Sequence, residues 1–190
     1  MSKDQSQKTK TPESKLSKSE WLSHGLEALR LYGIRGLNIE ALADYIGVTK
    51  GSFYWHFKNR KEFYKDLIKY WEQALTRIPM EKVKMSSEDP VLRLRLLMES
   101  VVNEELGKYD SDIRTLAAVE DIAEKAILRV DKERLSYVKT LFEEMGFSKK
   151  EADVRSRIFY LHFIGEFAVF KDKKERSKYI EEKHKFFTSR

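Results

Sequence analysis

The chain has 190 residues, 41% of them hydrophobic and 36% charged, a balance that allows a buried core and a water-soluble surface. It contains no cysteine, which excludes disulfides, thiolate catalysis and the usual cysteine-ligated zinc sites. Residues 1–65 hold 12 lysines and arginines against 7 aspartates and glutamates, so this third carries +5 of the net charge of +6 and favours a polyanionic partner.

The N-terminal residues divide into a polar arm and a helix. Residues 1–16 are lysine-rich and lack hydrophobic periodicity, so we expect a disordered basic arm. This arm either attracts phosphates or is a solvated tail without function. Ser17 and Glu20 fit a capping box, and the apolar face between Trp21 and Tyr32 predicts a first helix that ends at Gly33.

Two short helices joined by a glycine turn are predicted next. Asn38 is a suitable N-cap, and apolar residues at helical spacing follow over residues 39–46. Gly47 ends this helix, because glycine adopts the left-handed conformation without a steric penalty. Thr49 can cap a second helix over residues 50–57, whose outer face is basic and aromatic. This arrangement is typical of a helix-turn-helix unit that reads DNA.

A set of residues between positions 36 and 62 carries a family resemblance. They are Gly36-Leu37, Ile39 to Ala43, Gly47 to Tyr54, His56-Phe57 and Arg60 to Glu62. Together they resemble the DNA-binding domain of the TetR family of transcriptional repressors. The close resemblance covers roughly a quarter of the chain, and the remainder is similar only in length and helical layout. Asn38 replaces a frequent threonine and keeps the cap, whereas Arg60 replaces a lysine and changes the geometry toward phosphate.

Residue chemistry and the resemblance together predict the side chains that contact DNA. Lys50 can reach a guanine edge or a phosphate, Gly51 lets the backbone approach the duplex, and Ser52 can bond to a base or a phosphate. Trp55 can pack on a thymine methyl or a sugar, although Trp55 and Tyr54 could instead belong to the core. The resemblance assigns Tyr54, His56 and Arg60 to phosphate contacts, and the caps Asn38 and Thr49 lie beside them. The full set of predicted DNA-binding residues is Asn38, Thr49, Lys50, Gly51, Ser52, Tyr54, Trp55, His56 and Arg60.

The rest of the chain is predicted to be helical. Asn59 caps a third helix whose apolar stripe runs to Ile78, where Pro79 is expected to stop it before a polar connection over residues 79–90. Further helices are predicted over residues 90–107, 112–122, 125–145, 148–170 and 173–187. With about nine helices and no strand, the predicted fold class is all-α.

The second half of the helix that begins at Ser148 is apolar nearly all round, as in a helix at the centre of a core or in an interface. By resemblance, it forms a four-helix bundle between two subunits together with the last helix. A dimer also matches the repeat of the DNA helix, because two reading helices about 34 Å apart can enter successive major grooves. A monomer with a fully buried helix is the alternative. The predicted interface residues are Phe159, Phe163, Phe167 and Phe170.

The resemblance also implies a ligand pocket among the middle helices. Their aromatic side chains and few polar groups suit a small lipophilic or amphipathic effector, and a solid core is the alternative. The predicted pocket residues are Trp71, Arg114, Glu120, Tyr137, Phe159 and His162. The four histidines lack metal-ligand spacing, so neither a metal nor a cofactor is expected.

These observations predict a DNA-binding transcriptional regulator rather than an enzyme, since no phosphate-binding glycine loop or nucleophile elbow is present. We expect a three-helix helix-turn-helix domain over residues 17–64 and a helical effector-binding and dimerisation domain over residues 65–190. The expected form is a homodimeric repressor that binds a palindromic operator of double-stranded DNA and is released by the effector. One alternative is an architectural or nucleoid-associated protein on the same fold, without an effector. The other is an enzyme with a DNA-binding appendage, which the missing catalytic residues disfavour. No apolar run approaches the ~20 residues of a membrane span and no signal peptide is recognisable, so a cytoplasmic protein is expected.

Overall fold

The computed structural model describes residues 16–190, which contain helices and no strand. The all-α fold class predicted from the sequence is therefore confirmed. The predicted basic arm of residues 1–16 lies outside the described residues, except for Leu16, which packs against the first helices. Within residues 16–190, no helix has the length and apolar character that a membrane crossing requires.

From residue 16 to residue 54 the chain forms three helices, which we call the head: α1 (Lys18–Tyr32), α2 (Ile39–Ile46) and α3 (Lys50–Tyr54). A short 3-10 helix joins α1 to α2. The predicted caps of α1 and α2 are present. Ser17 forms the complete capping box at α1, and the Asn38 side chain accepts from two backbone N–H groups at the start of α2. The polar residues that precede these helices therefore set where they begin.

The second helix of the helix-turn-helix is shorter than the sequence predicted. It ends at Tyr54, and a closing turn follows in which the Phe57 N–H donates to the Phe53 carbonyl at 3.0 Å. Gly47 ends α2 with a φ of 81°, as expected for a left-handed glycine. Thr49 has an extended backbone at the start of α3, but its side chain makes no capping hydrogen bond.

A long helical rod leads away from the head. It consists of α4 (Arg60–Glu72), a π-helical turn (Gln73–Arg77) and α5 (Ile78–Ser86). The prediction that Pro79 ends the helix is wrong. The proline lies in the first turn of α5, where its missing N–H and fixed φ are tolerated, directly after the π-helical turn. The connection predicted over residues 79–90 shrinks to residues 87–89.

The remaining helices form what we call the body. They are α6 (Pro90–Asn103), α7 (Asp110–Ala117), α8 (Asp121–Glu144), α9 (Lys149–Val169), α10 (Lys173–Ser177) and α11 (Ile180–Thr188). Residues 16–190 thus contain more helices than the nine predicted. The rod adds α5, and Tyr179, whose φ of 62° is left-handed, splits the predicted last helix into α10 and α11.

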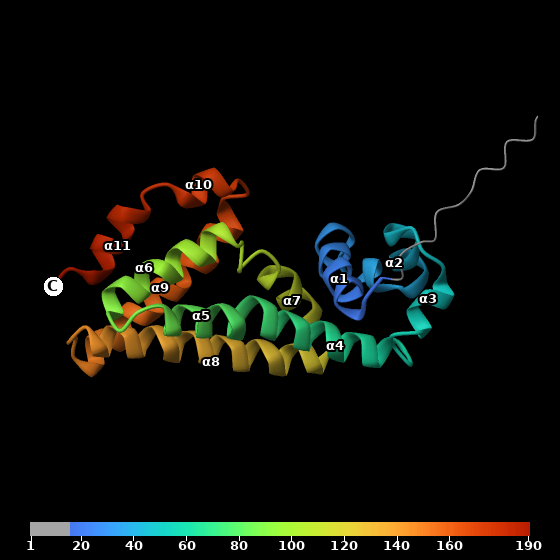
Figure 1. Ribbon diagram of the computed structural model, residues 1–190, viewed down its shortest axis with the longest axis horizontal. Helices are drawn as coiled ribbons and strands as arrows, with labels where there is room; N and C mark the ends of the chain where they lie inside the picture. The colour runs from blue at the N-terminus through green and yellow to red at the C-terminus, as the bar shows by residue number, and fades with distance from the viewer. Residues whose placement is uncertain (1–15) are drawn as a thin grey trace, which may run out of the picture.

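Figure 1 shows an elongated molecule with the head at one end and α11 at the other. α8 runs alongside α4 and α5, and ion pairs join the two: Arg129 to Glu72 at 2.5 Å and Arg77 to Glu133 at 2.8 Å. The rod therefore reaches from the head into the body and is braced along its length by α8.

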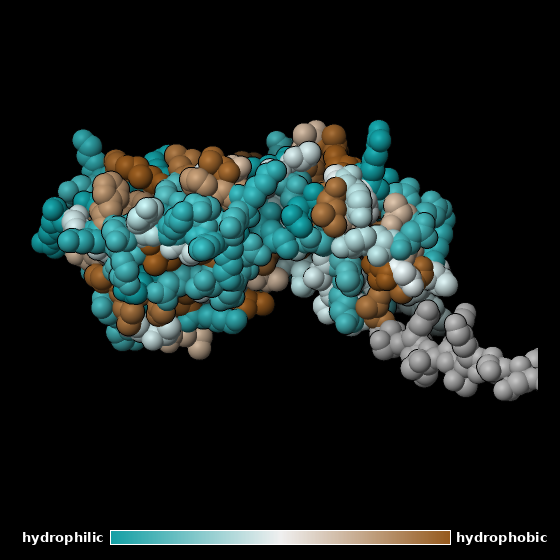
Figure 2. Space-filling model, turned by 90° about the horizontal axis from the view of Figure 1, so that it is seen from above, coloured by the Kyte–Doolittle hydropathy of each residue, from teal (hydrophilic) through white to brown (hydrophobic). Residues whose placement is uncertain are grey.

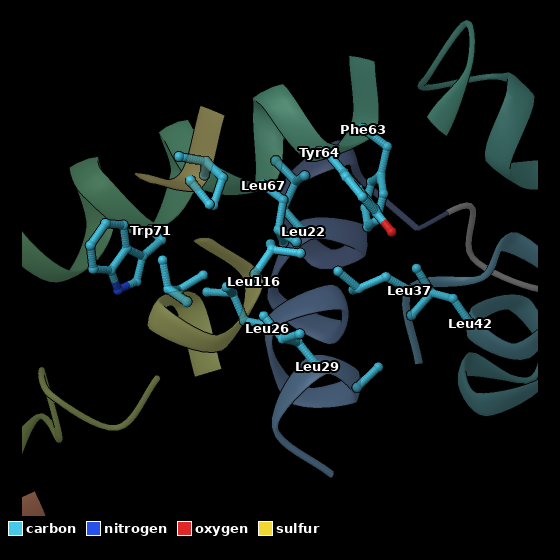
Figure 3. Packing of buried hydrophobic residues seen from close by; sticks show 14 of the residues in the cluster. Leu22, Leu26, Leu29, Leu37, Leu42, Phe63, Tyr64, Leu67, Trp71 and Leu116 are labelled. Atoms are coloured by element: carbon cyan, nitrogen blue, oxygen red, sulfur yellow. The ribbon is translucent and has the colours of Figure 1, made fainter. Parts of the chain in front are cut away.

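Among residues 16–190, two hydrophobic clusters hold the helices together. The first contains the inner side chains of the head and Leu67 and Trp71 of α4, and it also includes Leu116 of α7 and Ile127 of α8. Figure 3 shows Leu116 close to Leu26 of α1. The second cluster lies among α5, α6, α8, α9 and α11. Head and body share the first cluster, so no break in the core marks the predicted domain boundary between residues 64 and 65. That boundary stays a prediction, based on the different functions expected of the two parts.

Gly36 gives a test of how closely the head is packed. A Cβ at this position would lie 2.4 Å from the backbone oxygen of Ala28 in α1. Gly36→Ala is expected to lower the free energy of unfolding by about 1–3 kcal/mol, because a backbone oxygen cannot turn aside as a side chain can. Urea denaturation measures the loss. Gly51→Ala is the matched control, since the nearest atom there, the Thr49 Oγ1, is 3.8 Å away. Equal losses in the two variants would contradict the steric argument.

Candidate nucleic-acid interface and internal cavity

The inward face of α3 fixes the orientation of this helix. Phe53 and Phe57 are buried and pack against Trp21 of α1, with ring centroids 5.6 and 6.5 Å away in edge-to-face geometry. Phe63, near the start of α4, lies 5.5 Å from Phe53. Aromatic packing of this kind is both strongly hydrophobic and geometrically specific. The core of the head therefore determines which side of α3 faces outward.

The outer face of α3 is aromatic and exposed. Tyr54 is 52% exposed and Trp55 is 82% exposed, so neither belongs to the core, the alternative that the sequence left open. Lys50 and Gly51 are exposed at the start of the helix, and Ser52 is half-buried. The small residues leave room between the larger ones on this face.

Lys50 has an acidic neighbour in the head. Its ammonium group forms an ion pair with Glu40 of α2, and the hydrogen bond between them raises the pKa of Lys50. Half of the Lys50 side chain and 63% of the Glu40 side chain are exposed. Surface ion pairs of this kind contribute little free energy. A guanine edge or a phosphate can therefore replace Glu40 as the partner of Lys50 at small cost.

Arg60 begins α4 next to α3. Its guanidinium lies 4.8 Å from the centroid of the Tyr64 ring, and its Nε donates to the Tyr64 hydroxyl at 2.8 Å. His56 is half-buried, and its ring lies 6.2 Å from that of Phe57. The nine residues predicted to bind DNA lie in the cap of α2, the glycine turn, α3, the turn that closes α3 and the start of α4. Their contact with DNA stays a prediction.

A cavity of about 210 Å³ lies inside the body, next to the π-helical turn. Most of its wall is apolar. Representative residues are Pro79 of α5, Val101 of α6, Val138 of α8 and Phe163 and Phe167 of α9. The middle helices therefore enclose a space rather than a solid core.

Arg134 of α8 lies at the centre of the polar side of this cavity. Its guanidinium forms a buried ion pair with Asp110 of α7 and donates to the Thr76 hydroxyl at 2.8 Å. The Nη2 also donates to the carbonyl oxygen of Leu75 at 3.3 Å. In a regular α-helix this carbonyl would accept from the residue four positions later, which here is Pro79 and has no N–H. Arg134 thus replaces the donor that the proline removes.

Asp110 connects the cavity to α4, the part of the rod nearest the head. It accepts a hydrogen bond of 3.2 Å from the Nε1 of Trp71, which is fully buried among the side chains of the first cluster. A second connection runs through Tyr109, whose hydroxyl donates to Glu27 of α1 at 2.8 Å. Arg30 beside it lowers the pKa of Glu27 to about 2, so this carboxylate is charged at neutral pH. The wall of the cavity is therefore bonded to both α4 and α1.

A second ion pair lies on the same side of the cavity. Arg114 of α7 donates to both carboxylate oxygens of Asp131 in α8, at 2.8 and 3.1 Å. The Tyr160 hydroxyl of α9 donates to Asp131 at 2.6 Å. Burial, together with this hydrogen bond, raises the pKa of Tyr160 above its usual value. The hydroxyl therefore stays protonated at neutral pH.

The structure brings some of the predicted pocket residues together. Arg114, Tyr137 and Phe159 line the cavity. Trp71 does not line it and reaches it only through the hydrogen bond to Asp110.

Other predicted pocket residues lie elsewhere. Glu120 is the residue before α8, and His162 lies 3.5 Å from Glu166 on the side of α9 that faces α11. Asp110 and Arg134 were missed because charged residues in amphipathic helices usually face solvent, and only the fold shows that these two meet. Among residues 16–190, no group of three or more acidic or histidine side chains could hold a metal ion.

The spacing of the predicted interface residues places them on one side of α9, but this side faces the body rather than solvent. Phe159 and Phe163 are only 3% and 6% exposed and belong to the core of the body. Phe167 packs against Gly107, and Phe170 is the exposed member of the four. The prediction is therefore corrected for Phe159 and Phe163, because the chain's own core covers them.

A different face of α9 is apolar and exposed. Val154, Ile158 and Leu161 are 49%, 49% and 67% exposed, and their spacing of four and three residues aligns them in what we call the α9 stripe. Phe186 of α11 is 71% exposed. Figure 2 shows apolar patches on the otherwise hydrophilic surface of the C-terminal half. Three exposed apolar side chains in one row on a helix make this face of α9 a candidate interaction site.

Comparison with known proteins agrees with the helix-turn-helix. The model of the family described as "Bacterial regulatory proteins, tetR family" matches residues 22–67. The HTH-type transcriptional regulator AcrR of Shigella flexneri is 31% identical over 85 residues, which cover 41% of this chain and 40% of that protein. The similarity in sequence thus spans less than half the length of this curated relative.

Solved structures are similar over almost the whole chain. A transcriptional regulator from Rhodococcus sp. Rha1 is 14% identical with a TM-score of 0.70, over 91% of this chain and 94% of that one. A TetR transcriptional regulator from Legionella pneumophila is 11% identical with a TM-score of 0.71, over 93% and 97% of the two chains. At these identities the likeness shows the fold alone. Residues 22–67 therefore match the DNA-binding domain of the TetR family of regulators, and the chain as a whole shares the fold of the TetR-family structures to which it is similar.

Proposed function

We propose that this protein is a homodimeric repressor that binds a two-fold symmetric operator in the cytoplasm and leaves it when a small molecule occupies the cavity. Its relatives are transcriptional regulators rather than enzymes. The observation that carries the proposal is the bonding of the cavity wall to the rod. Leu75 and Thr76 of the rod bond to Arg134, and the same rod carries Arg60 beside the reading helix.

The outer face of α3 is the proposed contact with DNA. The major groove of B-DNA is about 12 Å wide and admits one α-helix. Lys50 and Trp55 then approach base edges and sugars, and Tyr54 and Arg60 approach phosphates on either side. This assignment is supported by the exposure of these side chains and by the burial of Phe53 and Phe57 on the opposite face.

The α9 stripe and Phe186 are the proposed dimer interface. Two copies of α9 and α11 would form a four-helix bundle in which the exposed apolar side chains cover one another. Figure 1 supports this arrangement, since α11 and α3 lie at opposite ends of the molecule. A dimer joined through the body leaves both heads free to enter successive major grooves about 34 Å apart.

The rod is the proposed route from the cavity to DNA. It runs from Arg60 to Ser86 and, at 1.5 Å per residue, extends about 40 Å. A molecule whose polar group bonds to Arg134 or Thr76 shifts the support of the Leu75 carbonyl and the position of Asp110 against Trp71. A small tilt of the rod then shifts the head by a larger distance. Such a molecule acts only through its difference in affinity for the two states, typically about 1–3 kcal/mol.

Selection of bound duplexes from a random pool tests the proposed function. The expected product is an inverted repeat whose halves lie about one helical turn apart. One asymmetric half-site would contradict the dimer, and recovery of unrelated sequences would favour the architectural alternative.

Arg60→Gln tests the proposed phosphate contact. The variant should bind all duplexes more weakly to a similar degree, and the slope of log affinity against log salt should flatten by about one unit. Fluorescence anisotropy at several salt concentrations measures both effects. Lys69→Gln, an exposed position on α4 farther from the head, is the control. An unchanged slope for Arg60→Gln, or an equal change in the control, would contradict the assignment.

A further inference from the structure

The cationic side chains on the polar side of the cavity already form ion pairs with carboxylates. Arg134 pairs with Asp110, and only 15% and 6% of these side chains are exposed. Arg114 pairs with Asp131 through two hydrogen bonds, and these side chains are 36% and 27% exposed. Each guanidinium is therefore matched by one carboxylate.

The third cation in the described wall of the cavity is also matched. Lys108 lies 3.1 Å from the Oε2 of Glu27, and its ammonium lies 5.1 Å from the centroid of the Tyr109 ring. Lys108 shares Glu27 with Arg30, and each cation of the described wall thus has an acidic partner without a ligand.

Because these cations are already paired, the pairing decides which charge a bound molecule can carry. A carboxylate that enters the cavity loses its water and finds a cation only if an existing ion pair opens. Opening the pair of Arg134 would leave Asp110 buried without a cation and would remove the donor to the Leu75 carbonyl. An uncharged molecule avoids both costs, and a single polar group on it can share hydrogen bonds with the existing network.

We infer that the effector is uncharged at neutral pH, mostly apolar, and carries one hydroxyl, carbonyl or amide group that faces Arg134, Thr76 and Tyr160. The inference rests on the proposed function, because it names the class of molecule for the same cavity. The apolar remainder of the molecule lies against the side chains of α5, α6 and α9.

The size of the cavity limits the molecule further. An engineered apolar cavity of about 150 Å³ in another protein binds benzene. The cavity here, about 210 Å³, therefore takes a somewhat larger molecule. A para-alkyl phenol and a straight-chain alcohol such as octanol are suitable probes.

We assign the selectivity against anions to Asp131, because its carboxylate already binds the guanidinium of Arg114. Its ion pair with Arg114 is partly exposed, so the carboxylate can be neutralised without leaving a fully buried charge. Asp131→Asn frees a guanidinium at the edge of the cavity, and a guanidinium binds a carboxylate through two parallel hydrogen bonds. The variant should therefore accept an anion that the wild type rejects.

Two matched pairs of probes test the inference by calorimetry on the full-length protein: para-ethylphenol against the para-ethylbenzoate anion, and octanol against octanoate. The neutral member of each pair should bind the wild type, at one molecule per chain, at least about tenfold more tightly than the anion. Asp131→Asn should improve the affinity for the anions by about tenfold and change that for the neutral probes little. Asp153→Asn is the control, since Asp153 lies on α9 in exposed ion pairs and does not line the cavity.

The outcomes separate this inference from the proposed function. Tighter binding of the anions by the wild type, or no binding of any probe, would overturn the assignment of an uncharged effector. An unchanged preference in Asp131→Asn would overturn the role of Asp131. Binding to the selected operator is measured in the same buffer. If an anion binds best and releases that operator, the inference of an uncharged effector fails while the proposed function stands. If the neutral probes bind without affecting the operator, the preference of the cavity for uncharged molecules stands while the proposed function fails.

Discussion

Leu161→Asp is expected to turn the proposed dimer into a monomer and to weaken binding to a two-fold operator by at least about a hundredfold. Leu161 is 67% exposed in the single chain, so the new carboxylate remains hydrated there and leaves the fold intact. In a dimer joined through the α9 stripe, the same carboxylate would be buried without a partner, at a cost of several kcal/mol. Sedimentation equilibrium measures the mass, and anisotropy with full and half operators measures the affinity.

Leu128→Asp is the matched control for this experiment. Leu128 lies on α8 and is 65% exposed, so the two variants make the same change at nearly the same exposure. The control should keep the mass and operator affinity of the wild type. A dimeric Leu161→Asp variant, or a monomeric Leu128→Asp variant, would show that the interface lies elsewhere. Phe163→Asp could not decide the question, because Phe163 is buried in its own subunit and the chain would unfold.

Arg134→Met is expected to be the most destabilising single change in the cavity wall. It leaves Asp110 buried without a cation and removes the donor to the Leu75 carbonyl, and breaking a buried ion pair costs about 3–5 kcal/mol. Urea denaturation measures the loss. Arg114→Met is the matched control, because its ion pair with Asp131 is partly exposed and should contribute about 1 kcal/mol or less.

Adding Asp110→Leu to Arg134→Met should recover part of the lost stability, since no unpaired charge then remains. Equal losses for Arg134→Met and Arg114→Met would contradict the view that Arg134 supports the rod. The double variant is also expected to bind operator without responding to any ligand, because the bond between cavity and Trp71 is absent. A normal ligand response from it would place the coupling outside the Asp110 connection.

The head was largely predictable because its signals are local. Ser17 and Asn38 act within one turn of helix, and Gly47 is confined by its own backbone. Such signals act between neighbours in the chain and can be read without the tertiary structure. The exposure of Trp55 was only one of two alternatives, because an aromatic residue on a short helix fits a core equally well.

The cavity and the surface of α9 were predicted less well, because their residues meet only in the folded chain. Arg134 and Asp110 are 24 residues apart, and neither has a sequence neighbour that indicates burial. Pro79 looked like a helix stop, since the residue that completes the hydrogen bonding there comes from α8. An all-round apolar helix such as α9 also gives no sign of which face is covered by its own subunit, so Phe163 and Leu161 were indistinguishable.

The shared first cluster has a consequence for how such regulators can recombine. A chimera that joins this head to the body of a relative at residue 64 would separate Leu26 and Leu37 from Leu116 and Ile127, with which they form one core. Side chains from two different proteins would then have to pack in one core although their volumes do not match, and mismatched volumes in a core are destabilising. The unit that can be exchanged intact is therefore the head together with α4, α7 and the first half of α8, even though these segments are far apart in the gene.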